Sequence, residues 1–293
     1  LESTIIDQNV QHLKKSGETP FAHGIHYEEL RNEFTHEDTI KSLLEGDSDW
    51  THPMDEAQEW IKSLKTQYDV ERLKEEASKV GTELTYKEFR TYFKSKREST
   101  ESSKSGRHMG HYKACLSDDT FAEVILHMMN IPMLCGFAAE RWKQSIAVMI
   151  PKDPGATKIH RIRVIQLLEA DLNAILSCIF GNRMVKFAAK HCGLNQSQFG
   201  RPGTLCQSAV INKVLSLEIS RLTKTDTSVM EVDAEGNYDR MVPELVAITC
   251  RRLGMPPQPC WMLVDCLNDM QHCVRTQLGQ SDAEYASSLG EYL

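Results

Sequence analysis

Apolar residues recur at intervals of three and four over most of this chain, which predicts a largely helical protein. The longest such segment, residues 169–190, places Leu172, Ile175 and Ile179 on one face. In another segment Pro132 should break the helix in part. The pattern predicts helices over residues 54–79, 85–96, 119–139, 169–190, 204–222 and 241–253.

Three short apolar runs predict β-strands at residues 145–150, 161–167 and 228–233. The turn-forming segment 153–157 joins the first two runs, which should therefore form a β-hairpin. A hairpin-like segment also occupies residues 274–293. Helices mixed with a few short strands place the chain in the α+β class.

Charge is unevenly distributed along the 293 residues. The formal net charge of −7 and the pI near 5.9 argue against a nucleic-acid-binding protein. Residues 1–60, however, contain 14 acidic and four basic side chains, so the remainder of the chain carries +3. Because the acidic excess is local, overall charge does not exclude a nucleic-acid partner.

A basic stretch covers residues 87–113, with eight Lys or Arg against three acidic residues. Aromatic rings lie among these charges, and charge with rings is the combination that single-stranded nucleic acids require. An ordinary helical surface followed by a linker explains the same pattern, and the sequence leaves both open. Residues 98–106 are too polar to pack and are the predicted linker. The rings are Phe89, Tyr92, Phe93 and Tyr112.

The predicted hairpin is also basic. Between residues 141 and 163 the chain has six Lys or Arg and a single acid, Asp153. These cations could bind a triphosphate, with Lys as a point charge and Arg as a planar fork. A solvated basic surface is the alternative. Arg163, on the second strand, is the first candidate for the triphosphate, followed by Lys152, Lys158 and Arg161.

Hydrophobic content of 41% is enough for a sizeable core, and no apolar run approaches the roughly 20 residues that span a bilayer. We therefore expect no membrane partner. The nine cysteines are odd in number and include no C-x-x-C pair, which predicts a reducing intracellular compartment, nucleus or cytoplasm. Several should be small core residues: Cys178, Cys250, Cys260 and Cys266.

The segment at residues 228–240 carries the strongest chemical signal. Asp233 ends the third apolar run, and Tyr238 and Asp239 follow five and six residues later. A carboxylate on a rigid strand end suits Mg²⁺, which binds through a few carboxylates and the phosphates of a substrate. Nucleotidyl transfer uses two such ions about 3.5–4 Å apart, so Asp233 alone is not enough. A strand-end Asp that merely caps a loop is the alternative.

The pattern Asp233-x₄-Tyr238-Asp239 resembles the first palm motif of reverse transcriptases, most closely those of non-LTR retrotransposons. Upstream segments resemble the family's other motifs in the family's order. These are the fingers strands at residues 142–152 and 158–168 and the F-G-x-x-x-G turn at residues 198–203. Val164 stands where the family's R-P-I triplet has proline.

The resemblance implies a right-hand polymerase fold and an RNA-directed DNA polymerase that uses Mg²⁺, an RNA template, a DNA primer and deoxynucleoside triphosphates. It makes Asp233 the catalytic metal ligand, Tyr238 the ring that excludes a ribose 2′-hydroxyl, and Asp239 an orienting residue. Arg107 and Arg201, in segments that resemble the family's entry loop and F-G turn, are the predicted nucleic-acid-binding residues.

In these terms the chain divides into an acidic helical N-terminal region (1–99), a fingers-like region (100–225) and a partial palm (226–293). The family's Gly-Gln-Gly and Asp-Asp motifs do not occur after Asp239. We expect the reading frame to continue beyond Leu293 into both, and we expect the isolated chain not to polymerise. Two alternatives stay open: a non-catalytic nucleic-acid-binding relic and a helical protein-interaction scaffold.

Overall fold

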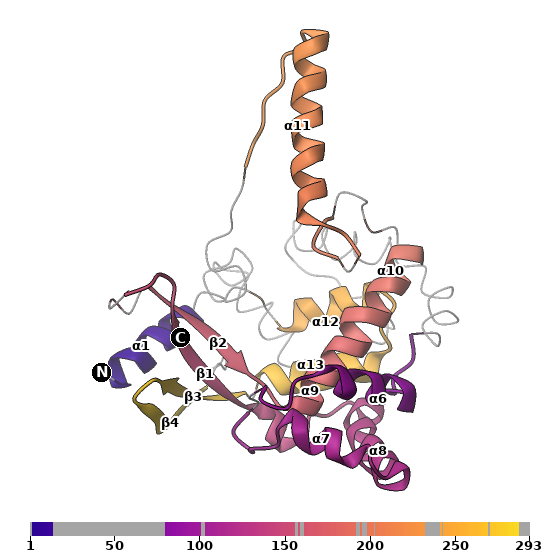
Figure 1. Ribbon diagram of the computed structural model, residues 1–293, viewed down its shortest axis with the longest axis vertical. Helices are drawn as coiled ribbons and strands as arrows, with labels where there is room; N and C mark the ends of the chain where they lie inside the picture. Colours follow the sequence, from indigo (N-terminus) through magenta and orange to yellow (C-terminus); the bar gives the residue numbers. More distant parts are fainter. Residues whose placement is uncertain are drawn as a thin grey trace, which may run out of the picture.

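The structure is a computed structural model in which a helical body adjoins a four-stranded sheet, so the protein is of mixed α+β class as the sequence predicts (Figure 1). It describes residues 2–13, 80–100, 103–155, 158, 161–191, 194, 198–201, 203–231, 241, 243–268 and 270–286. Among these residues no helix is long and apolar enough to cross a bilayer. The predicted helix over residues 54–79 lies outside the described residues.

The helical body is built from helices that bury aromatic and sulfur-containing side chains in one core. Trp142, Phe89 and Phe93 are completely buried there. The helices are α6 (Tyr86–Ser95), α7 (Met109–Cys115), α8 (Asp119–Cys135), the 3₁₀ turn η2 (Glu140–Lys143), α9 (Ala170–Ile175), η4 (Leu176–Met184), α10 (Val185–His191), α12 (Pro243–Arg252) and α13 (Pro257–Asn268). The four cysteines predicted to be core residues are all buried.

Local sequence sets where these helices begin and end. Thr85 and Glu88 form a capping box at the start of α6, and the Asp118 side chain accepts a hydrogen bond from the Phe121 amide at the start of α8. Helix α8 ends at Gly136, in the left-handed conformation with φ 77°. It continues through Pro132, which the sequence predicted would break it in part.

The predicted helix over residues 169–190 is confirmed as the continuous run α9, η4 and α10. Its middle nine residues, η4, form a π-helix, a winding usually limited to single turns. Arg183 in η4 donates to Glu88 at 2.7 Å and to the Val80 carbonyl at 2.8 Å, which ties this helix to the entry of α6. The π-helical winding was not predicted.

The sheet has the strand order β2-β1-β3-β4. β1 (Gln144–Pro151) pairs antiparallel with β2 (Ile162–Leu167), which confirms the predicted hairpin. β3 (Gln271–Thr276) pairs parallel with β1 and antiparallel with β4 (Gly279–Ala286). The helix α1 (Glu2–Leu13) covers one face of the sheet (Figure 1). Its contacts there are apolar, with Ile5, Ala147, Val274 and Tyr285 buried together.

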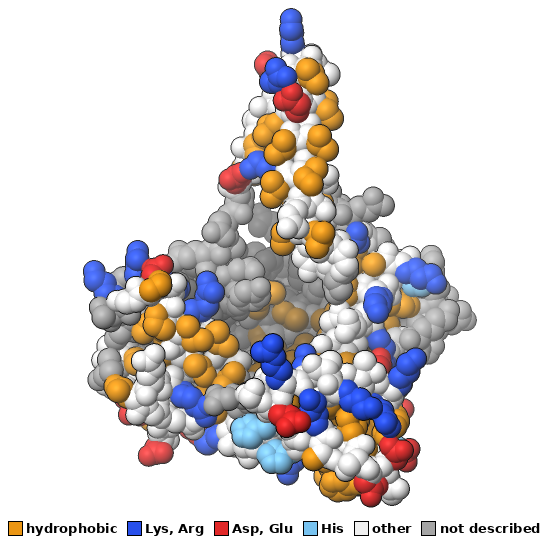
Figure 2. Space-filling model, viewed as in Figure 1, with side chains coloured by type: hydrophobic (Ala, Val, Ile, Leu, Met, Phe, Trp, Pro, Cys, Tyr) orange, Lys and Arg blue, Asp and Glu red, His pale blue; other side chains and the backbone are white. Residues whose placement is uncertain are grey.

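Helix α11 (Cys206–Thr223) projects from the rest of the molecule (Figure 1). None of its residues is buried, and apolar side chains are exposed along its length (Figure 2). The segment that follows it was predicted to be a buried strand over residues 228–233. That prediction is wrong for residues 228–231, which form no strand. Val229 and Met230 are 51% and 87% exposed, because this segment leaves the projecting helix without packing on the core.

The burial of a serine and of three aromatic rings corrects two further predictions. Residues 98–106 were predicted to be an unpacked linker, yet Ser103 is buried and donates its hydroxyl proton to Glu169. The rings of Phe89, Phe93 and Tyr112 were candidates for base stacking, but they are buried, and Phe93 and Tyr112 stack on each other at 4.6 Å. These rings belong to the core because α6 and α7 turn their apolar faces inward.

Candidate nucleic-acid interface

The tip of the β1–β2 hairpin presents cations to solvent. Lys152, Lys158, Arg161 and Arg163 are all exposed. The backbone at the tip is closed by a hydrogen bond from the Lys152 amide to the Arg161 carbonyl and by another from the Arg161 amide to the Lys158 carbonyl, both of 2.9 Å. Arg161 also pairs with Asp153 at 2.9 Å, an exposed contact that contributes little stability. The four predicted triphosphate-binding cations therefore lie on one hairpin.

The sheet face opposite α1 joins apolar and basic side chains. Directly paired residues share a face, so Ile150 and Arg163 lie together, as do Val148, Ile165 and Arg275. Ile150 and Ile165 are about two-fifths exposed, at 41% and 40%. This open sheet face, made of Val148, Ile150, Arg163, Ile165 and Arg275, combines two cations with apolar side chains, and Arg275 donates to Gln280 at 2.8 Å.

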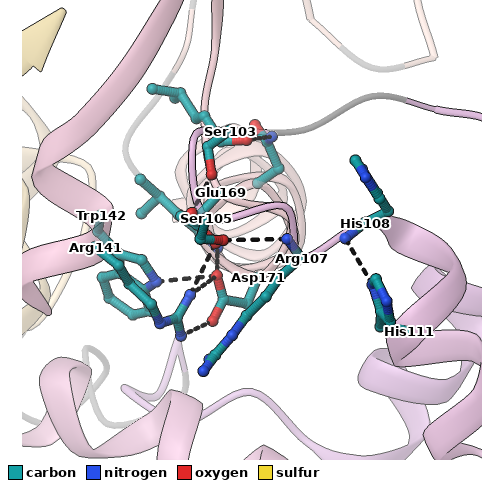
Figure 3. Close-up of polar contacts among 12 residues, drawn as sticks. Ser103, Ser105, Arg107, His108, His111, Arg141, Trp142, Glu169 and Asp171 are labelled. Atoms are coloured by element: carbon teal, nitrogen blue, oxygen red, sulfur yellow. Dashed lines mark hydrogen bonds and ion pairs between the residues drawn. The ribbon is translucent and has the colours of Figure 1, made fainter. Parts of the chain in front are cut away.

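The hairpin base is fixed by a buried polar network that joins η2, directly before β1, to the start of α9, after β2 (Figure 3). Arg141 binds Asp171 through both terminal nitrogens and Glu169 at 3.1 Å. The Trp142 indole donates to Asp171 at 3.0 Å. Both carboxylates are completely buried, and charges so far from water require partners of this kind. The network therefore holds both ends of the hairpin against one helix.

The pKa values of Arg141 and Tyr112 both reflect burial next to the carboxylate of Asp171. Burial alone would lower the pKa of Arg141, but the hydrogen bonds and charge of Asp171 raise it above its ordinary value. Burial, and then Asp171, raise the pKa of Tyr112. Both shifts favour a protonated Arg141 and a protonated Tyr112 beside the buried carboxylates.

The loop that precedes α7 is also held in place. Ser103 binds Glu169, Lys104 pairs with Glu284 of β4, and the Arg107 amide donates to Ser105 at 3.2 Å. His111 accepts a hydrogen bond from the His108 amide through Nδ1 at 3.0 Å (Figure 3). These contacts place Arg107 beside the buried network.

The predicted palm residues cannot be placed in the same way. Asp233, Tyr238 and Asp239 lie outside the described residues, so their predicted roles stay predictions. Arg201 is half-buried, and its carbonyl accepts hydrogen bonds from Thr204 before α11. Neither Arg201 nor Arg107 belongs to the β1–β2 hairpin. No three His, Cys, Asp or Glu side chains of the described residues gather as a metal site.

Sequence reasoning missed the buried network of Arg141, Glu169 and Asp171. A signal was present, because two acids stand at the start of a long apolar helix where little else is charged. Charges at such a position must be paired. Pairing with Arg141, however, requires the β1–β2 hairpin to bring the segment before β1 next to the segment after β2. Arg275, on the open sheet face, was missed because β3 lies 120 residues or more after β1 in sequence.

Comparison with models of protein families finds none that matches this chain, and comparison with curated proteins finds no match either.

Proposed function

We propose that this chain is the fingers and first part of the palm of a reverse transcriptase of the non-LTR retrotransposon type. The complete protein would extend a DNA primer on an RNA template with deoxynucleoside triphosphates. The single observation that supports the proposal is the antiparallel β1–β2 hairpin, which carries the exposed cations Lys152, Lys158, Arg161 and Arg163.

The hairpin suits a triphosphate for three reasons. Lys152, Lys158 and Arg161 lie between the strands and Arg163 lies on β2, so the cations can approach a compact anion from the turn and from one strand. Arg163 lies beside Ile150 on the open sheet face, where a guanidinium fork can meet phosphate oxygens. The buried network at the hairpin base limits movement, which reduces the entropy lost on binding.

In this proposal Asp233 holds Mg²⁺, and Tyr238 excludes ribonucleotides by overlap with the 2′-hydroxyl. Bound Mg²⁺ would stabilise the attacking and leaving oxygens of nucleotidyl transfer. The residues described here contribute binding and charge neutralisation. Template and primer contacts fall to the open sheet face.

Triphosphate binding by the chain itself tests the proposal. We expect Arg163→Ala to weaken deoxynucleoside triphosphate binding by about tenfold in calorimetric titration, because one charge-assisted contact is lost. Arg163→Lys should restore part of the affinity. Lys190→Ala, an exposed cation on α10, is the matched control and should bind as the wild type does. Equal affinity in Arg163→Ala and Lys190→Ala would contradict the assignment of the hairpin.

Catalysis needs a second measurement, on a product that includes the Asp-Asp motif. There Asp233→Ala should abolish primer extension and leave template binding within about twofold, since a lost metal ligand does not remove phosphate contacts. Extension that survives this substitution would refute the polymerase assignment. If no extension occurs even with Asp233, the relic alternative holds.

A second candidate function is a protein-interaction scaffold. It is favoured by α11, whose apolar residues Val210, Val214 and Leu217 recur at helical spacing and are each exposed.

A further inference from the structure

A pocket of about 280 Å³ opens between α7 and α8, away from the hairpin tip. Arg141 and Asp171 of the buried network form part of its wall. It is lined by Arg107, His111, Tyr112, Cys115, Ile125, Met128, Met129, Arg141 and Asp171.

The lining has an apolar side and a polar side. Ile125, Met128 and Met129 come from α8, and Cys115 from the end of α7. Methionine side chains adapt to planar groups of different outline, so this side can accept more than one base. The polar side offers donors, chiefly Arg107 and His111.

The contacts around the polar side chains determine how each of them can interact with a ligand. His111 Nδ1 accepts the His108 amide, so the neutral ring carries its proton on Nε2 and can donate from there. Arg141 is engaged by Asp171 and Glu169, and Arg107 and His111 line the same pocket on its polar side. The pKa of Cys115 is raised by burial, so this thiol adds no negative charge.

The pocket walls are preorganised. Tyr112 stacks on Phe93 inside the core, and the loop that carries Arg107 is held by Ser103 and Lys104 at two separate elements. Gly106, at φ 70°, makes the left-handed turn that directs the chain into Arg107. Together these contacts of the loop fix the position of Arg107.

We propose that this pocket binds one unpaired nucleotide of a single-stranded nucleic acid, with its base against Ile125 and Met128 and its phosphate at Arg107 and His111. A volume of about 280 Å³ is large enough for a single nucleotide unit. The inference rests on the proposed function, in that the chain must bind a strand. It adds a contact separate from the triphosphate site on the hairpin.

Cysteine footprinting reads this pocket directly, because Cys115 lines it while Cys135 and Cys206 are exposed elsewhere. The wild-type chain is treated with N-ethylmaleimide, alone or saturated with a short single-stranded RNA, and each thiol is followed by mass spectrometry. DNA of the same sequence forms a second arm. We expect alkylation of Cys115 to slow by about fivefold or more with the strand bound, as one stacked base requires. Cys135 and Cys206 should react unchanged.

Matched variants supply the second readout, measured as affinity by fluorescence anisotropy. Arg107→Ala should weaken binding about five- to tenfold through loss of a phosphate contact, whereas Arg97→Ala, an exposed cation outside the pocket lining, should not. Met128→Glu should weaken binding, whereas Ile131→Glu, on the same helix outside the pocket lining, should have little effect. Both Met128 and Ile131 are exposed, so neither substitution threatens the core.

The outcomes separate this proposal from the one on which it rests. Cys115 that stays fully reactive under a saturating strand, or equal affinities of Arg107→Ala and Arg97→Ala, would overturn the pocket alone. In that case the hairpin variant Arg163→Ala still reports on the proposed function. A wild-type chain that binds neither RNA nor DNA would overturn both.

Discussion

At the scale of single residues, Gly254 is fixed by two independent constraints. Its φ of 92° is one that side chains with a Cβ rarely adopt, and a Cβ there would lie 2.2 Å from Cε1 of Phe187. Both the backbone and the α10 core therefore require glycine. The turn that ends α12 can approach the long helix only without a side chain.

We expect Gly254→Ala to lower the free energy of unfolding by about 2–4 kcal/mol, from backbone strain and overpacking together. Gly155→Ala is the control, because Gly155 has a similar φ of 78° and nothing within 4 Å of the added Cβ. It should cost about 1 kcal/mol. Urea denaturation measures both, and equal losses would show that the clash with Phe187 is relieved without cost.

His272 is a residue whose chemistry depends on burial. It lies in β3, and Ser145 Oγ lies 2.5 Å from its Nδ1. Ser145 donates its own proton to Gln166, so it accepts from His272 Nδ1, and Nε2 is left without a partner among the described residues. Burial lowers the pKa of His272 from 6.5 to about 4.

This shift predicts how stability depends on pH. The unfolded chain binds a proton at His272 near pH 6.5, and the folded chain does not. The contribution of His272 to the free energy of unfolding is therefore complete above pH 6.5 and is lost as the pH falls toward 4. Between pH 7 and pH 5 the wild type should lose about 2 kcal/mol more than His272→Gln. The control His127→Gln, at an exposed site on α8, should follow the wild type in urea denaturation at both pH values.

At the scale of elements, the hairpin depends on its base more than on its tip. The buried pair of Arg141 and Asp171 holds the start of β1 to α9, whereas Arg161 and Asp153 pair in solvent at the tip. A buried carboxylate that loses its charge leaves a guanidinium without its main partner. When an exposed ion pair is broken, water replaces the lost contact, so the free energy of unfolding changes little.

We therefore expect Asp171→Asn to reduce the free energy of unfolding by about 3 kcal/mol. Asp153→Asn removes the same charge from the exposed pair and should change it by less than about 1 kcal/mol. Thermal or urea unfolding compares the two. Similar effects would show that the network at the hairpin base is not what anchors it.

The elements themselves were largely predictable where their signals are local. Hairpin β1–β2, helices α6, α8, α11 and α12 and the long helix follow from apolar spacing and turn residues. The strand predicted at residues 228–233 fails over residues 228–231, because an apolar run becomes a strand only where a neighbour pairs with it. In the candidate site, the cations of the hairpin were predictable, but the Arg141 network and the Arg107 pocket were not.

At the scale of the whole molecule, charge is the property that separates the candidate functions. The open sheet face, the hairpin and the Arg107 pocket place cations on several elements of a chain with a formal net charge of −7. Phosphate contacts release counterions, and a scaffold that binds protein through apolar surface does not.

The chain should therefore bind single-stranded RNA with an affinity that falls steeply as salt rises. With about three to five phosphate contacts, log K should fall with log salt with a slope of roughly −2 to −4, measured by filter binding. Arg107→Ala should make the slope less steep by about 0.7, the value for one phosphate contact on a single strand. A flat response would support the protein-interaction scaffold instead.

The amino-acid sequence by itself determined the local features: the helices, the basic hairpin, the uneven charge and the motif at Asp233. These depend on neighbours within a few residues, which periodicity and turn chemistry record. Only the tertiary structure decided that β3 and β4 extend the hairpin into a sheet, that Phe89 and Phe93 belong to the core, and that Arg107 meets a pocket walled by Arg141 and Asp171. Each of these joins segments far apart in the chain, where burial and pairing, which no local pattern encodes, determine the contact.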